Sequence, residues 1–153
     1  MVRILVTALH STLFFGTTAF AADAVDGTWA LNVAKSKFSG AAPASGTRVY
    51  TESADGTTLD SKLVGADGKE AAMHVTLTYD GKAHPITGNP DADSGTGKAV
   101  NSRITSFTLT KGGKVVGTVH RVVSKDGKTL TVHNKGTHSD GKPYDDTLVF
   151  DKQ

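Results

Sequence analysis

The recurrence of Asp-Gly constrains the fold of this chain more than any other sequence feature. Glycine readily adopts the positive φ that tight turns need, so Asp-Gly favours β-hairpins, either as a two-residue loop or as the end of a three-residue loop. Short runs rich in Val, Thr and Leu separate these turns, which predicts an antiparallel meander. The turns are Asp55-Gly56, Asp67-Gly68, Asp80-Gly81, Asp126-Gly127 and Asp140-Gly141, with Gly112-Gly113 in a similar setting.

The length of each loop decides which side chains share a face, because a one-residue slip turns every side chain to the other side of the sheet. A three-residue loop at 54–56 pairs Thr51 with Leu59 and sets Arg48 and Tyr50 on the outer face. A two-residue loop mixes apolar and charged side chains, so the three-residue loop is predicted. The same length is predicted at 66–68, 125–127 and 139–141.

The predicted pairs sort the apolar residues into one inner face. They include Leu63 with Ala71, Val132 with Leu148, Leu130 with Phe150 and, across a two-residue loop at Gly112-Gly113, Phe107 with Thr118. Lys135 lies opposite Asp145 on the outer face, which is a favourable cross-strand pair. The inner set comprises Leu59, Leu63, Met73, Val75, Leu77, Tyr79, Phe107, Leu109, Val116, Val122, Leu130, Val132, Leu148 and Phe150.

Three valines do not fit this pattern, because the same registers place Val115, Val119 and Val123 outside. Either another surface covers them, or the loop at 125–127 has two residues. In the first case His120 points inward beside Val122. In the second, Arg121 turns inward and His120 faces His133 at the surface. We adopt the first interpretation.

The fold class that follows is all-β, a meander of eight to nine strands closed as an up-and-down barrel. A sheet of that many twisted strands closes on itself or splits into a sandwich, and hairpin connections favour the barrel over a Greek-key sandwich. Segments 34–47 and 81–97 do not alternate and are predicted loops. The strands are expected at 27–33, 48–53, 57–64, 70–79, 99–103, 104–111, 114–124, 128–135 and 145–151.

Residues 1–21 are expected to be a secretory signal peptide. Arg3 supplies the positive charge, 4–16 is mostly apolar, and Ala19-Phe20-Ala21 fits the small-x-small rule for cleavage after Ala21. The apolar stretch is shorter than the ~20 residues of a membrane-spanning helix, although a retained anchor is the alternative. We expect one domain over 22–153, periplasmic or secreted, with no membrane association after leader removal.

Composition excludes several classes of function. The chain has 17 Lys and Arg, one of them Arg3, and 15 Asp and Glu, so 16 basic residues remain against 15 acidic ones after leader removal. They are scattered, without a run that binds nucleic acid. The absence of cysteine removes disulfides, thiol nucleophiles and thiolate metal sites. No nucleophile stands beside a base, and neither catalysis nor a cofactor is expected.

No metal site is expected either. The five histidines after the leader do not share a face at ligand spacing under the adopted registers. Residues 89–98 differ from an EF-hand loop, because Gly95 comes one place late and Val100 stands where a bidentate Glu is needed.

Three short motifs resemble known proteins. "GTWALNVAKSKF" at 27–38 resembles the first strand of the calycins, the superfamily of lipocalins and fatty-acid-binding proteins, in which the tryptophan plugs one end of the barrel. "RVVSKDGKTLTV" and "LVFDK" are similar to the last strands of fatty-acid-binding proteins. The whole chain also resembles a group of small exported lipocalin-like bacterial proteins. This resemblance implies a barrel that binds a small molecule in its interior.

Two departures accompany the resemblance. Segment 34–47 is too short for the two lid helices of fatty-acid-binding proteins, and Leu148 and Phe150 replace the Arg-x-Tyr that holds the ligand carboxylate in that family. Arg121 lies near the position of an interior arginine of that family. In lipocalins, an arginine near the last strands packs on the tryptophan instead, and Arg121 would then contact Trp29.

The leading hypothesis is an exported non-enzymatic barrel that binds a small apolar or amphipathic ligand. A second hypothesis is a packed interaction module that uses the Val115, Val119 and Val123 stripe, with an unknown oligomeric state. A third is a barrel enzyme that works through His120 and Tyr79. The predicted ligand-binding residues are His120, Tyr79, Met73, Phe107, Trp29 and Arg121.

Overall fold

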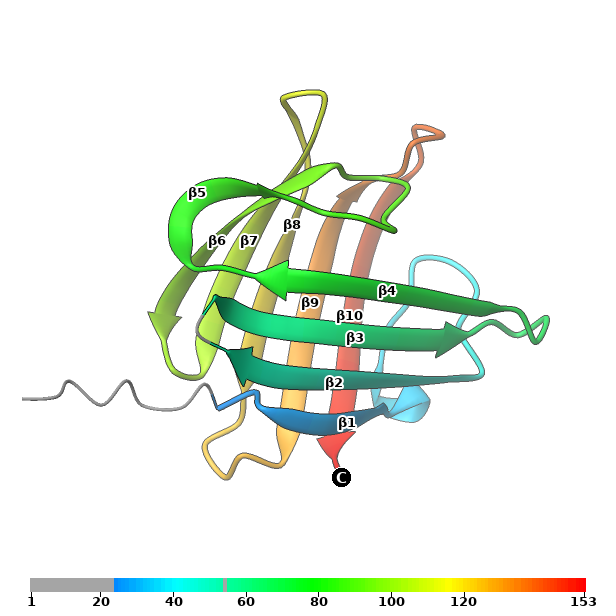
Figure 1. Cartoon of the computed structure of the whole chain (residues 1–153). Coiled ribbons are helices and arrows are strands. Elements are labelled where there is room, and N and C mark those ends of the chain that lie inside the picture. Colours follow the sequence, from blue (N-terminus) through cyan, green and yellow to red (C-terminus); the bar gives the residue numbers. More distant parts are fainter. Residues whose placement is uncertain (1–23, 54) are drawn as a thin grey trace, which may run out of the picture.

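The computed structural model describes residues 24–53 and 55–153, so the predicted leader and its cleavage site lie outside the described residues. Ten antiparallel strands and one short 3-10 helix follow one another along this part of the chain (Figure 1). The elements are β1 Gly27–Leu31, η1 Val33–Lys35, β2 Ser45–Ser53, β3 Gly56–Val64, β4 Glu70–Leu77, β5 Asp80–Pro85, β6 Ser94–Asn101, β7 Ile104–Lys111, β8 Lys114–Val123, β9 Thr129–Thr137 and β10 Pro143–Lys152.

The strands form one sheet in the order β4-β3-β2-β1-β10-β9-β8-β7-β6-β5. Strands that are consecutive in sequence are neighbours everywhere except between β4 and β5, and β1 pairs with β10. The all-β meander is therefore confirmed. The sheet is strongly curled (Figure 1), but within the described residues no ladder joins its edges, β4 and β5, which are linked through Thr78 and Tyr79. The result is a half-barrel with an open seam between these edges.

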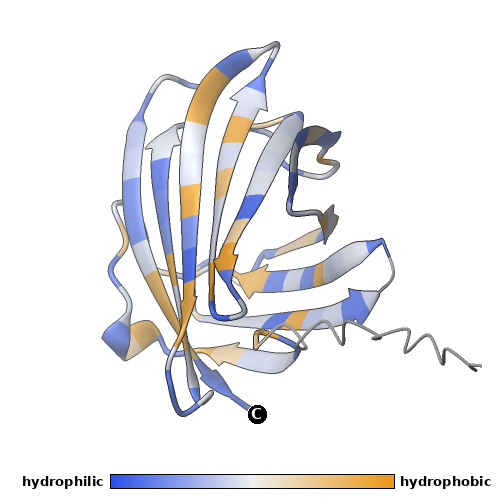
Figure 2. Cartoon of the chain, turned by 90° about the vertical axis from the view of Figure 1, so that its left-hand side faces the viewer, coloured by the Kyte–Doolittle hydropathy of each residue, from blue (hydrophilic) through white to orange (hydrophobic). Residues whose placement is uncertain are grey.

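Two of the predicted registers are confirmed. Leu63 pairs with Ala71 across the loop at 66–68, and Leu130 pairs with Phe150 across the loop at 139–141. In both loops the glycine has positive φ, +78° at Gly68 among them, which is the conformation that a three-residue hairpin loop requires. Polar and apolar residues alternate along the strands (Figure 2), and the apolar face lines the inside of the curl.

The predicted register between β2 and β3 is wrong by one residue. Ser53 pairs with Gly56, so Tyr50 faces Leu59 and Arg48 faces Ser61. Arg48 and Tyr50 are therefore buried, at 8% and 2% exposure. The alternation of apolar and polar residues argued against this register, because it places a charged side chain among apolar ones. However, the methylene stem of an arginine covers apolar surface much as an aliphatic side chain does.

The predicted inward position of His120 is also wrong. Val123 pairs with Leu130 and His120 with His133, so Arg121 is buried and His120 is exposed. The loop has four residues, 125–128. The Ser124 hydroxyl donates to Asp126 and accepts from the Thr129 amide. The strands on either side of this loop pair in the same register that a two-residue loop would produce.

A β-bulge in the β7–β8 hairpin moves Val116 and Val122 out of the predicted inner set. The two-residue loop at Gly112-Gly113 is present, with φ of +56° and +77°. The register then shifts between Leu109 and Thr110, so that Phe107 pairs with Val119. A bulge opposes two residues to one and reverses the facing of everything beyond it. Val119 and Val123 consequently face inward, while Val115 stays 67% exposed.

One strand was missed entirely, because 81–97 was predicted to be a loop. It contains most of β5 and the first part of β6. The inward positions of β6 include Gly95 and Gly97, over which Ile86 and Phe107 pack, so no alternation of large apolar residues marks it. β5 is an edge strand and ends at Pro85, a position where a sheet tolerates proline.

The base of the half-barrel, near the β8–β9 loop and the C-terminus (Figure 1), holds the most buried side chains. We call this group the base cluster: Val25, Trp29, Val123, Leu130 and Phe150. The Trp29 indole donates from Nε1 to the Val25 carbonyl at 2.6 Å. The cluster closes this end of the sheet.

Candidate functional site

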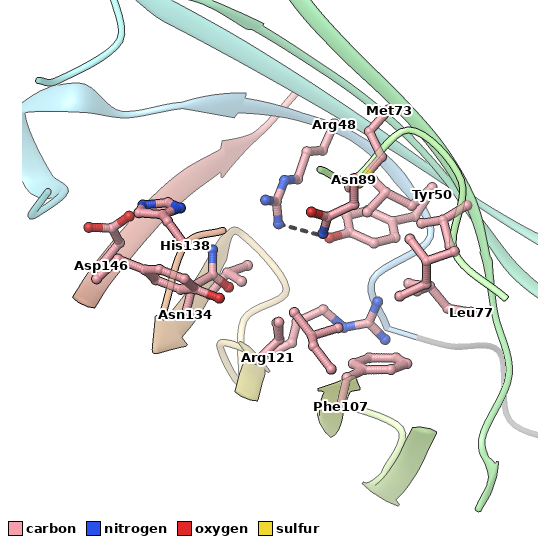
Figure 3. A pocket seen from close by; sticks show the side chains of 17 residues that line it. Arg48, Tyr50, Met73, Leu77, Asn89, Phe107, Arg121, Asn134, His138 and Asp146 are labelled. Carbon is pink, nitrogen blue, oxygen red and sulfur yellow. Dashed lines mark hydrogen bonds between the residues drawn. The ribbon is translucent and has the colours of Figure 1, made fainter. Parts of the chain in front are cut away.

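A cavity of about 260 Å³ lies inside the curl, on the inner face of the sheet (Figure 3). Most of its wall is apolar, and a few polar side chains interrupt it. Such a composition is typical of sites for small organic ligands. The lining residues are Arg48, Tyr50, Leu59, Met73, Val75, Leu77, Ile86, Asn89, Phe107, Leu109, Val119, Arg121, Val132, Asn134, His138, Tyr144 and Asp146.

Arg48 is a buried cation on the cavity wall. Its guanidinium donates from Nη1 to the Tyr50 hydroxyl at 3.4 Å and lies 4.8 Å from the centre of the Phe150 ring. Its Nε has no hydrogen-bond acceptor. Figure 3 shows the side chain reaching into the space between Tyr50 and His138. A buried charge is stable only when it is paired or hydrogen-bonded, and the contacts of Arg48 are weak.

Arg121 is a second buried cation and lies on β8, at 3% exposure. It donates from Nη2 to the Tyr79 hydroxyl at 2.7 Å, and its guanidinium carbon lies 5.0 Å from the centre of the Tyr50 ring. Tyr79 in turn packs against Phe107, with 5.6 Å between ring centres. Aromatic faces attract guanidinium groups, so these contacts hold the Arg121 side chain within the wall.

The end of the cavity opposite the base is covered by the loop at 86–93, which we call the cover loop. Ile86 and Asn89 of this loop line the cavity. Asp91 accepts from the Ser139 amide at 2.7 Å and bonds to His138 Nδ1 at 2.8 Å. The cover loop is thus joined to the β9–β10 turn by one carboxylate.

Two pKa shifts follow from this arrangement. Burial raises the pKa of Asp91, but the hydrogen bonds from His138 and Ser139 outweigh it and leave that pKa below its ordinary value. Burial, followed by the negative charges of Asp91 and Asp146, raises the pKa of the Tyr144 hydroxyl. The covered end is therefore acidic in character, whereas the inner wall carries Arg48 and Arg121.

The structure brings three of the six predicted site residues together on the cavity wall: Met73, Phe107 and Arg121. Tyr79 lies directly behind that wall, hydrogen-bonded to Arg121. Trp29 is fully buried in the base cluster and does not line the cavity. His120 lies on the outer face of the sheet beside His133.

Arg48 and Tyr50 were missed as site residues, because the three-residue loop placed both outside. A signal for them existed in the sequence. They stand two residues apart on one strand, and with a two-residue loop they share the face of Leu59. Asn134 was also missed, and its Oδ1 is buried on this wall without a hydrogen-bond donor.

Comparison of the chain with models of protein families, with curated proteins and with solved structures gave no match. Within residues 24–53 and 55–153, no helix has the length and apolar character needed to cross a membrane. In the same residues, no three His, Asp or Glu side chains are grouped as metal ligands.

Proposed function

We propose that this protein is an exported, non-enzymatic binding protein that holds one small apolar or amphipathic molecule inside its curled sheet. The observation that carries the proposal is the cavity of about 260 Å³, with a mainly apolar wall and two buried arginines. At roughly 30 Å³ for each water-sized group, this space fits about nine such groups.

The calycin resemblance belongs to this proposal. It is supported by the meander topology, in which the first strand pairs with the last, and by the burial of Trp29 at one end of the sheet. Barrels of about eight strands either fill their interior with side chains or leave room for one small ligand. The cavity favours the second arrangement.

The two other hypotheses have less support. The outer valine stripe of an interaction module is reduced to Val115, because Val119 and Val123 face inward. His120 and Tyr79, the pair that an enzyme would use, lie on opposite faces of the sheet: His120 is exposed, and Tyr79 bonds to the buried Arg121.

A neutral apolar dye, N-phenyl-1-naphthylamine, tests the proposal. We expect saturable binding of one molecule, seen as a rise in dye fluorescence. Val119→Phe adds a ring inside the cavity and should weaken binding at least about tenfold, the effect of about 1.4 kcal/mol. Val115→Phe adds the same ring on the outer surface and should leave binding unchanged. Binding that is absent from the wild type, or equal in both variants, would contradict the proposal.

A further inference from the structure

The charge of Arg48 has no strong partner in the part of the chain that the structure describes. No carboxylate there forms an ion pair with it, its Nε meets no acceptor, and its remaining contacts are the Tyr50 hydroxyl and the Phe150 ring. A desolvated cation without a counter-charge is unfavourable. Arg48 is nevertheless 92% buried, since 8% of its surface is exposed.

Asp146 is the acidic residue on the cavity wall, and its carboxylate is already engaged elsewhere. Its Oδ1 accepts from both the amide and the hydroxyl of Ser39, at 2.6 Å each. It forms no ion pair with Arg48. In Figure 3 Asp146 stands beside His138, at the covered end, while Arg48 reaches toward Tyr50 and Asn89.

Tyr50 brings the two buried cations close to one another. Arg48 donates to its hydroxyl, and the Arg121 guanidinium lies over its ring. Charges of one sign within a low-dielectric enclosure raise the local potential and concentrate ions of the opposite sign. The wall around Tyr50 is therefore suited to a negative group, and the apolar wall beyond it, which includes Leu59 and Met73, is suited to a hydrocarbon chain.

We propose that the ligand is an amphipathic anion whose head group accepts hydrogen bonds from the Arg48 guanidinium and the Tyr50 hydroxyl. The inference rests on the proposed function and names the chemical class of its ligand. The head group is an oxyanion, either a carboxylate or a sulfate or phosphate monoester, because the planar guanidinium fork matches the paired oxygens of these groups. The volume of the cavity indicates a tail of roughly eight to ten carbons, from about nine water-sized groups.

The experiment is displacement of N-phenyl-1-naphthylamine by four amphiphiles with the same ten-carbon tail: decanoate, decyl sulfate, decanol and decyltrimethylammonium. At pH 7.5 we expect decanoate or decyl sulfate to bind about 10- to 100-fold more tightly than decanol, the value of a hydrogen bond to a charged group. The cation should bind most weakly. A preference for one anion over the other identifies the head group. Equal binding of the acid, alcohol and cation overturns the inference.

Arg48→Met tests the residue itself. It should remove the preference for the anion over decanol, with a loss of about tenfold or more in anion affinity and no loss for decanol. Arg48→Lys keeps the charge without the fork and should retain part of the preference. The matched control is Arg103→Met, which removes an equal charge from a residue outside the cavity lining and should keep the preference intact. Preference that survives Arg48→Met overturns the inference.

A measurement on the wild-type protein tests the inference even if the Arg48→Met variant does not fold. The Nε–H of Arg48 has no acceptor without ligand, so its proton resonance should move downfield when decanoate binds and stay in place with decanol. An unmoved resonance in the decanoate complex would contradict the inference. If neither the dye nor any of the four amphiphiles binds, the proposed function fails as well. If all bind alike, only the anion inference fails.

Discussion

The base cluster and the cavity wall are made from the same strands, yet they treat polar groups in opposite ways. At the base, the one polar atom of Trp29 meets the Val25 carbonyl, and the Lys152 ammonium lies 5.1 Å from the Trp29 ring while donating to the Asp26 carbonyl. On the cavity wall, Arg48 Nε and Asn134 Oδ1 are buried without partners.

This difference predicts that stability and the proposed ligand binding depend on different parts of the sheet. Buried polar groups in folded proteins are almost always satisfied, and each exception needs a reason. The base has no such exceptions among its five residues, which fits a role in holding the fold. Within the described residues, the exceptions on Arg48 and Asn134 lie on the cavity wall, while the hydroxyls of Thr78 and Thr105 are buried outside its lining. Each of the following predictions changes one side of this contrast.

Trp29→Ala should have the largest effect on the free energy of unfolding. It leaves a void in the base and removes the donor to the Val25 carbonyl, so we expect a loss of about 3–5 kcal/mol. Trp29→Phe keeps most of the volume and should cost about 1–3 kcal/mol, because the buried carbonyl loses its donor. Urea unfolding followed by far-ultraviolet circular dichroism measures both. A loss below ~1 kcal/mol for the alanine variant would contradict the assignment of stability to the base.

Gly97→Ala tests how tightly the cavity wall is packed. A Cβ at this position would lie 2.0 Å from the Thr78 carbonyl oxygen and 2.6 Å from Phe107, so the seam connection or the Phe107 ring must move. We expect a loss of about 1–3 kcal/mol from this overpacking, by the same urea assay. Gly40→Ala is the control, since nothing lies within 4 Å of its Cβ, and its effect should stay within ~0.5 kcal/mol. Equal losses of unfolding free energy in the two variants would show that the sheet is loosely packed around Gly97.

Arg48→Met should act in the opposite direction on the ligand-free protein. Replacing a poorly paired buried charge by an apolar side chain of similar length is neutral or stabilising, and we expect a gain of about 1 kcal/mol in unfolding free energy. Function and stability would then compete at this position. Thermal unfolding of ligand-free protein, with Arg103→Met beside it, measures the change. A loss of ~1 kcal/mol or more in unfolding free energy would contradict this prediction and show that Arg48 stabilises the fold, as the base cluster does.

Asp91→Asn should have the smallest effect, because it changes a partly exposed link between the cover loop and the β9–β10 turn. At pH 7 we expect a loss of about 0.5–1 kcal/mol, from the hydrogen bonds of Ser139 and His138. The pKa of Asp91 is lowered in the folded protein, so this contribution is present above the ordinary aspartate pKa of about 3.9 and disappears as the pH falls through the lower, folded value.

The measurement for Asp91 is unfolding free energy against pH, from 7 down to 3. The curves of wild type and Asp91→Asn should converge at the acid end. Glu52→Gln, at an exposed position of β2, removes an equal charge and serves as the control. Parallel curves for wild type and Asp91→Asn would show that the carboxylate does not hold the cover loop.

Loop length could be predicted where the glycine alone determines it. At Gly68 and Gly141 the positive φ closes a three-residue loop, and the registers on both sides agree with the prediction. The β8–β9 loop depends on the Ser124 hydroxyl, and the β7–β8 hairpin contains a bulge at Leu109. The misplaced Val119 and Val123 were the only sign of these two features in the sequence, and alternation did not show which turn caused it, so the prediction failed there by one residue each time.

The candidate site was predicted only in part for the same reason. Met73, Phe107 and Arg121 line the cavity, although the adopted register placed Arg121 outside and the calycin resemblance pointed to it. Arg48 could not be found by a rule that assigns charged residues to solvent. A buried charge breaks the alternation on which the prediction relies, so the position of Arg48 became clear only when the register was known.

For the proposed ligand, the seam between β4 and β5 offers a way in. Since the described residues form no row of backbone bonds along this line, separating the two borders would break contacts of side chains such as Ile86 and Leu77, which lie on the cavity wall. Amide protons on the outward sides of β4 and β5 should then exchange with deuterium faster than those of β9 and β10, and the route inward would run between the borders rather than through the base.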